Sequence, residues 1–195
     1  MRILCVGDSL TEGDYGIKGS RGIGNVHAEN YPFFLSQMTG AETINAGKCG
    51  YTSTSYLKYY KNGNVNAEGA DIIIVMLGSN GGLDPSADTQ GNADYEELIT
   101  LLKTASPAAR LVVCTPPHVT ENPAYSNCGY AERVDKAVRF VRAYAARTGT
   151  ELIDVATAPM FTAETESIMQ PNDGLHFGEE GYRTLAKFFA EQLGL

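Results

Sequence analysis

The stretch IIIVML at residues 72–77 is a run of six apolar residues between Asp71 and Gly78. It shows no alternation of apolar and polar residues, which is typical of a parallel strand that is covered on both faces. Residues 111–114 have the same character, and further candidate strands lie at 3–6, 42–44 and 152–155. We therefore predict five strands in a mostly parallel sheet.

Three longer segments have the spacing of amphipathic helices. In residues 93–104, 130–147 and 179–193, apolar side chains recur every three or four positions. Strands that alternate with helices predict right-handed βαβ units and an α/β fold, a three-layer α/β/α sandwich. The length suits one domain over residues 1–195. The segments predicted to be irregular loops are 11–30, 60–70, 81–92, 115–129 and 156–175.

The composition excludes several classes of partner. The chain has 15 Lys and Arg against 23 Asp and Glu, a formal net charge of −8, so it should not attract nucleic acid or anionic membrane surfaces. The four cysteines form no C-x-x-C pair, which argues against zinc and disulfide frameworks. The apolar run before residue 7 is too short for a signal peptide, and no run is long enough for a membrane anchor. We expect a cytoplasmic protein, unless a leader has been removed.

Glycine and polar residues follow the predicted strands. In an open parallel sheet, ligands bind outside the carboxyl ends of the strands, so these segments should meet at one edge. They are GDSL (7–10), NAGKCG (45–50), GSNG (78–81) and TPPH (115–118), and DGLH (173–176) precedes the last predicted helix.

Together these segments contain the parts of an acyl hydrolase. Ser9 can attack an ester carbonyl if His176 takes its proton and Asp173 orients the imidazole. Backbone N–H groups of Ser9 and of a glycine, with an asparagine amide, can stabilise the resulting oxyanion. Because Thr11 lies two residues after Ser9, the sequence differs from the G-x-S-x-G elbow of α/β-hydrolases. This chemistry needs no cofactor and no metal.

In this order, the segments resemble the four marker blocks of the GDSL-type SGNH hydrolases, which contribute Ser, Gly, Asn and His. The blocks at 7–10, 45–50, 78–80 and 173–176 cover essentially the whole chain. The resemblance implies a flavodoxin-like sandwich and a triad of Ser9, His176 and Asp173. It also implies an oxyanion hole made of the Ser9 N–H, the Gly50 N–H and the Asn80 side chain.

The chain departs from the family pattern in its third block. Gly81 follows Asn80 where the family often has an aspartate. In the second block Gly47 remains an alternative donor to Gly50. Each residue also has a structural explanation, since a serine can cap a helix and a glycine can simply form a turn.

Further residues compete for the same roles. Asp8 and Asp154 are alternative carboxylates, while His27 and His118 are alternative bases, and His118 is also a candidate substrate contact. A metal site made from Asp8 and the 173–176 loop lacks any known ligand spacing.

The predicted function is that of a serine esterase acting on a small-molecule ester, with an acetyl or other short acyl group on a carbohydrate as the first choice. Acyltransfer, lysophospholipid cleavage and thioester hydrolysis by the same residues are alternatives. A carbohydrate-binding module without activity is an alternative of another class. The sequence does not indicate the oligomeric state.

Overall fold

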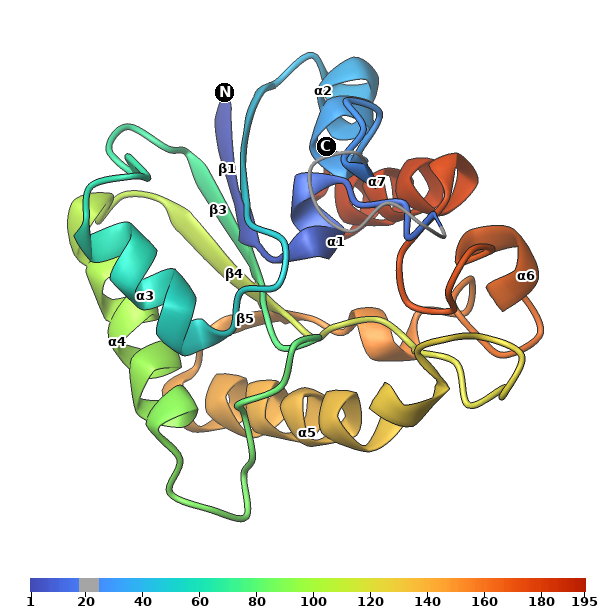
Figure 1. Cartoon of the computed structure of the whole chain (residues 1–195). Helices are drawn as coiled ribbons and strands as arrows, with labels where there is room; N and C mark the ends of the chain where they lie inside the picture. Colours follow the sequence, from blue (N-terminus) through green and yellow to red (C-terminus); the bar gives the residue numbers. More distant parts are fainter. Residues whose placement is uncertain (18–24) are drawn as a thin grey trace.

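The computed structural model describes residues 1–17 and 25–195 of the chain. Five parallel strands form one sheet in the order β2-β1-β3-β4-β5, the flavodoxin-like order (Figure 1). The strands are β1 (Arg2–Gly7), β2 (Glu42–Gly47), β3 (Ile72–Met76), β4 (Arg110–Cys114) and β5 (Glu151–Ile153). The predicted α/β sandwich with a five-stranded parallel sheet is therefore confirmed.

Helices cover both faces of the sheet. They are α1 (Ser9–Glu12), α2 (Tyr31–Thr39), α3 (Ser53–Lys61), α4 (Gln90–Ala105), α5 (Ala131–Thr148), α6 (Glu166–Met169) and α7 (Glu179–Leu193). Figure 1 shows α2 and α7 on one side of the sheet and α3, α4 and α5 on the other. Short 3-10 turns lie at Cys128–Tyr130 and Val155–Thr157.

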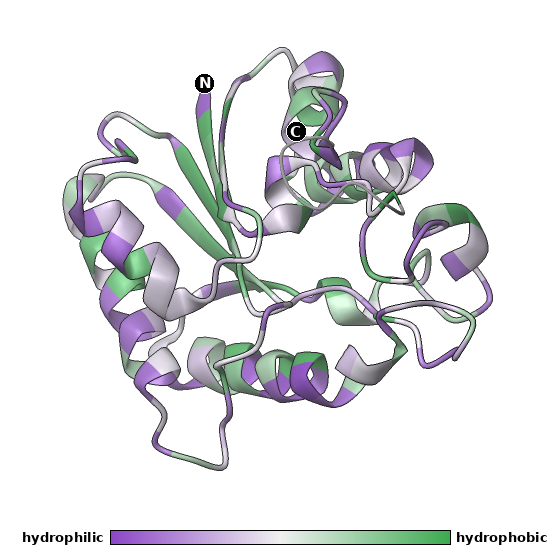
Figure 2. Ribbon diagram, in the orientation of Figure 1, coloured by the Kyte–Doolittle hydropathy of each residue, from purple (hydrophilic) through white to green (hydrophobic). Residues whose placement is uncertain are grey.

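Strand β3 shows why the apolar run at its centre is uninterrupted. All five of its residues are buried. Ile73 and Val75 pack into the cluster beneath α3, α4 and α5, whereas Ile72, Ile74 and Met76 pack into the cluster beneath α2 and α7. Both faces of this strand are thus removed from water, and in Figure 2 the strands of the sheet carry the hydrophobic colour.

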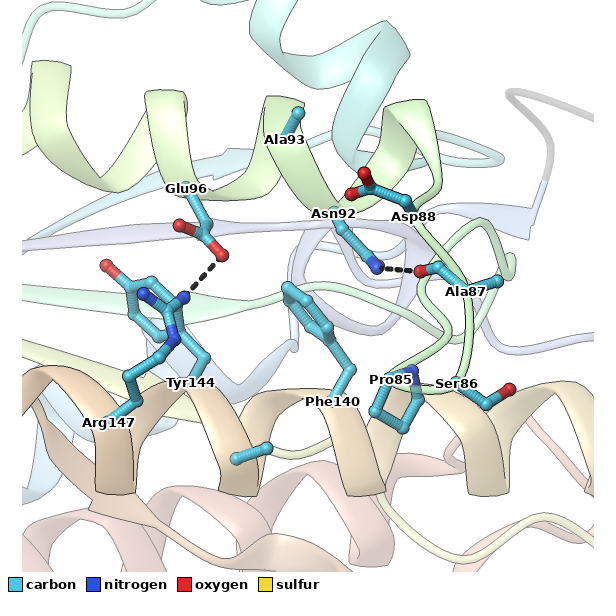
Figure 3. A pocket seen from close by; sticks show the side chains of 11 residues that line it. Pro85, Ser86, Ala87, Asp88, Asn92, Ala93, Glu96, Phe140, Tyr144 and Arg147 are labelled. Atoms are coloured by element: carbon cyan, nitrogen blue, oxygen red, sulfur yellow. Dashed lines mark hydrogen bonds and ion pairs between the residues drawn. The ribbon is translucent and has the colours of Figure 1, made fainter.

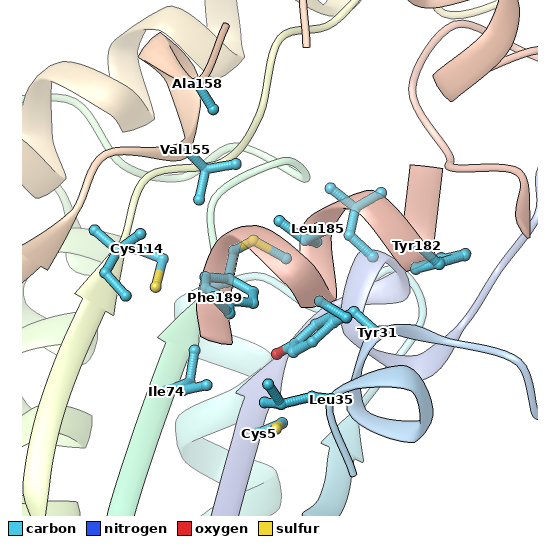
Figure 4. Close-up of a cluster of buried hydrophobic side chains, with 14 of the residues drawn as sticks. Cys5, Tyr31, Leu35, Ile74, Cys114, Val155, Ala158, Tyr182, Leu185 and Phe189 are labelled. Atoms are coloured by element: carbon cyan, nitrogen blue, oxygen red, sulfur yellow. The ribbon is translucent and has the colours of Figure 1, made fainter. Parts of the chain in front are cut away.

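The cluster on the α2 and α7 side combines aliphatic side chains with aromatic rings and two thiols (Figure 4). Tyr31 and Phe189 are fully buried with ring centroids 5.0 Å apart. Cys5 and Cys114 are fully buried beside them, and burial raises the pKa of both thiols. These two cysteines therefore act as small core residues.

The described helices differ from the prediction mainly by two additions. Helices α2 and α3 were not anticipated, although Asn30 caps the first through Phe33 N and Thr52 with Ser55 forms a capping box on the second. The predicted loop at 11–30 begins inside α1, and its residues 18–24 lie outside the described part. The predicted loop at 81–92 overlaps the start of α4, and the predicted loop at 156–175 contains α6. Among the described residues, no helix is both long and apolar enough to cross a membrane.

Candidate active site

Ser9 lies where β1 turns sharply into α1. Asp8 caps this short helix, since its Oδ1 accepts a hydrogen bond from Leu10 N at 3.1 Å. A Cβ on Gly7 would collide with Thr11 Oγ1 and would lie 2.7 Å from the Met76 carbonyl oxygen. Only glycine lets the helix start this close to the sheet, and the turn holds Ser9 at the carboxyl end of the central strands.

The loop before α7 brings His176 and Asp173 to Ser9. His176 Nε2 lies 2.8 Å from Ser9 Oγ, and His176 Nδ1 lies 2.7 Å from Asp173 Oδ2. Asp173 Oδ1 also accepts hydrogen bonds from the backbone N–H groups of Leu175 at 3.0 Å and His176 at 2.9 Å. The three side chains form one continuous hydrogen-bonded chain.

The environment of this pair favours its charged forms. Burial raises the pKa of Asp173, but the hydrogen bond and charge of His176 outweigh it and hold that pKa below its ordinary value. Burial lowers the pKa of His176, but the hydrogen bond and charge of Asp173, with smaller contributions from Asp14 and Asp8, hold it above its ordinary value. The aspartate is therefore ionised at neutral pH and strengthens the imidazole as a base.

Two neighbouring segments hold this loop in place by hydrogen bonds. Thr120 N donates to the Gly174 carbonyl oxygen at 2.8 Å. The fully buried Gln170 donates from Nε2 to the carbonyl oxygens of His118 at 2.7 Å and Leu175 at 3.0 Å. The position of His176 is thus set by packed backbone and not by its own side chain alone.

Gly50 and Asn80 lie in adjacent loops on the same edge. Gly50 has φ +76°, and Tyr51 N donates to the Lys48 carbonyl oxygen at 3.2 Å, the arrangement of a type II turn over residues 48–51. Asn80 Nδ2 donates to the Tyr51 carbonyl oxygen at 3.2 Å, which joins the loop after β3 to this turn. Gly47 N instead donates to Asn45 Oδ1 at 2.9 Å.

Asp8 faces the loop after β3 and not His176. Its Oδ2 accepts a hydrogen bond from Ser79 Oγ at 2.6 Å, and Ser79 precedes Asn80. Burial raises the pKa of Asp8, although the hydrogen bond from Ser79 opposes this. Asp8 is therefore hydrogen-bonded to Ser79 and not to the His176 imidazole.

Asp154 and His27, which compete for the roles of carboxylate and base, have partners of their own. Asp154 accepts hydrogen bonds from Arg142 Nε and Thr115 Oγ1, each at 2.9 Å. His27 stacks on Tyr15 with centroids 4.0 Å apart. Within residues 1–17 and 25–195, no group of three His, Cys, Asp or Glu side chains could hold a metal ion.

His118 lies beside α6. Its Nε2 lies 3.6 Å from the buried Glu166 Oε2. Its role as a substrate contact stays a prediction.

Two carboxylates near Ser9 were not singled out from the sequence. Asp14 Oδ2 lies 4.0 Å from His176 Nε2 and 3.8 Å from Cys49 Sγ. Glu12 Oε1 accepts from Lys48 Nζ at 2.6 Å. Both carboxylates lie shortly after the GDSL segment, but nothing in the sequence indicates their partners. Burial raises the pKa of the Cys49 thiol, which is therefore no candidate nucleophile.

A separate hollow of about 610 Å³ lies between α4 and α5 (Figure 3). None of the residues described above lines it. Two of its charged side chains pair with each other, since Arg147 Nη2 lies 2.5 Å from Glu96 Oε1. The residues suited to catalysis therefore lie at the strand ends and not in this hollow.

Comparison with known proteins identifies the family of the chain. The sequence matches the GDSL-like lipase/acylhydrolase family over residues 5–184. The chain belongs to this family. This GDSL hydrolase is accordingly an ester-hydrolysing enzyme, which disfavours the alternative of a binding module without activity.

Solved structures of similar fold cover nearly the whole GDSL hydrolase. An aryl esterase from M. smegmatis is 22% identical with a TM-score of 0.75, over 99% of this chain and 98% of that one. A lipase/acylhydrolase from Enterococcus faecalis is 20% identical with a TM-score of 0.72, over 98% and 94%. A carbohydrate acetylesterase from Sinorhizobium meliloti is 18% identical with a TM-score of 0.71, over 99% and 98%. A comparison with curated proteins finds none whose sequence matches this enzyme.

Proposed function

We propose that this GDSL hydrolase cleaves carboxylic esters through an acyl-enzyme on Ser9. The observation that carries the proposal is the hydrogen-bonded chain from Asp173 through His176 to Ser9, with distances of 2.7 and 2.8 Å. His176 Nε2 takes the hydroxyl proton as Ser9 Oγ attacks the ester carbonyl carbon, and Asp173 stabilises the imidazolium that forms. A nucleophile and base in contact, with the base oriented by a third group, are the usual signature of such catalysis.

The developing oxyanion is stabilised by the N–H groups of Ser9 and Gly50 and by the Asn80 side-chain amide. A side-chain amide has two N–H donors, and Asn80 uses one of them on the Tyr51 carbonyl oxygen, so a second remains for substrate. Gly50 is favoured over Gly47 because Gly47 N already donates to Asn45. Losing one such donor typically costs about a hundredfold to a thousandfold in rate.

The acyl-enzyme then breaks down by the same groups. The protonated His176 donates its Nε2 proton to the leaving alcohol oxygen as the tetrahedral intermediate collapses. A water molecule then attacks the acyl carbon while His176 accepts its proton. His176 returns this proton to Ser9 Oγ as the bond between Ser9 and the acyl carbon breaks, which releases the carboxylic acid. An alcohol in place of water would make the enzyme an acyltransferase.

We propose a small, uncharged ester, with acetyl on a carbohydrate first, as the substrate class. Carboxylates surround Ser9 within the described site, and they disfavour an anionic substrate. Tyr51 and Tyr59 stack edge to face, with centroids 5.6 Å apart, beside the turn at 48–51, and aromatic rings suit the apolar face of a sugar. The name of the Sinorhizobium meliloti protein, a carbohydrate acetylesterase, is consistent with this proposal.

The decisive experiment is Ser9→Ala measured on a short p-nitrophenyl ester. We expect kcat to fall by about a thousandfold or more with the protein still folded, because no other group replaces the nucleophile. The control Ser86→Ala alters an exposed loop serine and should retain activity. Wild-type kcat in the Ser9 variant would contradict the proposal, as would a fluorophosphonate adduct on another residue. A panel of acetylated sugars, aryl esters, thioesters and longer acyl chains then ranks the substrates, and added alcohol acceptors reveal acyltransfer.

A further inference from the structure

We propose that Glu12 is a positioning residue that holds the turn at residues 48–51 so that the Gly50 N–H points at the reacting carbonyl oxygen. We call these four residues the oxyanion turn. The inference rests on the proposed function, since it assigns Glu12 a role only if Ser9 and Gly50 have theirs.

The geometry joins Glu12 to the turn at two points. Its Oε2 accepts a hydrogen bond from Cys49 N at 2.5 Å, and its Oε1 accepts one from Lys48 Nζ at 2.6 Å. Cys49 directly precedes Gly50, so the carboxylate holds the peptide unit next to the one that carries the Gly50 N–H. Glu12 lies three residues after Ser9 in α1, and one short helix therefore places both the nucleophile and the support of the turn.

The remaining contacts of the turn explain why this support matters. Tyr51 N donates a hydrogen bond to the Lys48 carbonyl oxygen, and Cys49 N donates one to Glu12 Oε2. Among the described residues no acceptor takes the Gly50 N–H, which leaves it for a ligand. Gly50 is exposed, and a Cβ placed on it would touch nothing within 4 Å, so packing does not hold this residue. The hydrogen bond to Glu12 therefore constrains the turn before Gly50, while the hydrogen bond from Asn80 to the Tyr51 carbonyl oxygen constrains it after Gly50.

A bare carboxylate beside an oxyanion would be unfavourable, and Lys48 neutralises it. Burial raises the pKa of Glu12, but the hydrogen bonds from Cys49 and Lys48 together outweigh this and hold it below its ordinary value. Glu12 is thus ionised at neutral pH, and a charge-assisted hydrogen bond to Cys49 N is stronger than a neutral one. The side chain is 20% exposed, so the ion pair is partly shielded from solvent.

The same construction recurs on the other side of the nucleophile. Asp8 accepts a hydrogen bond from Ser79, the residue before Asn80, as Glu12 does from the residue before Gly50. Two carboxylates flanking Ser9 thus each hold the residue that precedes a proposed oxyanion donor. This parallel supports a role for both carboxylates in aligning the donors, and the test below separates that role from simple stability of the loop.

The test compares Glu12→Met, which keeps the side-chain length but accepts no hydrogen bond from Cys49, with Glu12→Gln, which keeps an acceptor. For Glu12→Met we expect kcat on p-nitrophenyl acetate to fall about tenfold to a hundredfold, because a donor is misaligned and not deleted. We expect KM to change by less than about twofold, since the loss is confined to the transition state. Binding of phenylboronic acid, which forms a tetrahedral adduct on an active serine, should weaken by the same factor as kcat/KM falls. Glu12→Gln should stay within about threefold of the wild type.

A matched control and a measurement on the unaltered protein complete the design. Glu151→Gln breaks an ion pair of similar length, to Arg110 Nη2 at 2.5 Å, remote from Ser9 and should leave kcat unchanged. If Glu12→Met does not fold, NMR on the wild type decides. The Cys49 amide proton should then lie far downfield and move upfield as Glu12 is protonated.

Three results would overturn the inference. The first is wild-type kcat and wild-type boronate affinity in Glu12→Met. The second is a loss of kcat in Glu12→Gln as large as that in Glu12→Met. The third is a Cys49 amide proton whose chemical shift does not change as Glu12 titrates. Ser9→Ala is measured alongside. An inactive Ser9 variant with a fully active Glu12→Met rejects only the role of Glu12, whereas an active Ser9 variant rejects the proposed function itself.

Discussion

At the scale of the residue, the carboxylates facing His176 determine the pH at which it can act as a base. Asp173 lies on its own loop, Asp14 Oδ2 lies 4.0 Å from its Nε2, and Asp8 adds a smaller effect through its charge alone. Burial lowers the pKa of His176, but these charges together hold it above its ordinary value. Because the proposed base must be neutral, kcat/KM should rise with pH through this raised pKa.

Replacing Asp14 by Asn removes one of the charges that raise this pKa. The acid limb of the kcat/KM profile should therefore move to lower pH, while the plateau at high pH changes by less than about twofold. The exposed Asp88 serves as a control, because Asp88→Asn should leave the limb in place. A limb that stays in place or moves to higher pH in Asp14→Asn would show that Asp14 does not act on His176.

The sequence predicted which residues belong to one site better than it predicted their supports. Ser9 and His176 are 167 residues apart, and the strand-end rule does not connect them, because DGLH precedes a helix. The chemistry of a nucleophile with its base and the order of the marker blocks predict their meeting. Their catalytic roles stay a prediction. Glu12 and Asp14 had no such signal, because a carboxylate in a turn is usually solvated and its partner, here Cys49 or His176, is fixed only by the fold.

At the scale of the element, the contact between α1 and the end of β2 determines where the oxyanion turn begins. A Cβ on Gly47 would collide with Glu12 N and would lie 2.6 Å from the carbonyl carbon of Thr11. Both atoms belong to the backbone, so neither can rotate away. The residue must be glycine for steric reasons, and its φ is not positive.

Gly47→Ala should therefore push β2 away from α1. We expect a loss of about 1–3 kcal/mol in the free energy of unfolding, the usual cost of overpacking. We also expect a lower kcat, because the oxyanion turn starts at the next residue. Gly129→Ala is the matched control, since a Cβ there meets nothing within 4 Å and its φ is not positive, and it should change stability by less than about 0.5 kcal/mol. Equal unfolding midpoints for the two variants in urea would refute this account of the contact.

The helices that the sequence did not predict show the limit of periodicity. Helices α2 and α3 have nine residues each, and α3 is rich in tyrosine and polar residues, so neither shows a long apolar stripe. Their signals were the caps at Asn30 and Thr52, which periodicity does not detect. The longer helices α4, α5 and α7 all agree with the predicted segments within a few residues.

At the scale of the whole molecule, the strand order explains why the site forms where it does. In the order β2-β1-β3-β4-β5, the strands that follow β1 in the chain lie first on one side of it and then on the other, and ligands bind at such a switch point between the loops after β1 and β3. Ser9 follows β1 and Asn80 follows β3, so both flank this switch point. The order could not be derived from the apolar runs alone, because these runs are compatible with several arrangements of five parallel strands.

The overall charge predicts how the enzyme should discriminate among substrates. A formal net charge of −8, with carboxylates gathered around Ser9, should attract a cationic ester and repel an anionic one. Such steering is screened by salt, since the Debye length falls from about 10 Å at 0.1 M to about 3 Å at 1 M. The preference should therefore weaken as salt is added.

Acetylcholine and its uncharged analogue 3,3-dimethylbutyl acetate have nearly the same shape and test this directly. At low salt we expect kcat/KM for the choline ester to exceed that of the analogue by about twofold to tenfold, the lower end of electrostatic steering. The ratio should approach one near 1 M salt, while kcat/KM for neutral p-nitrophenyl acetate stays constant. A ratio that does not depend on salt would mean that contacts in the site, and not the field of the whole molecule, select the alcohol. The strength of the salt dependence thus separates steering by all the charges of the chain from recognition by the few carboxylates beside Ser9.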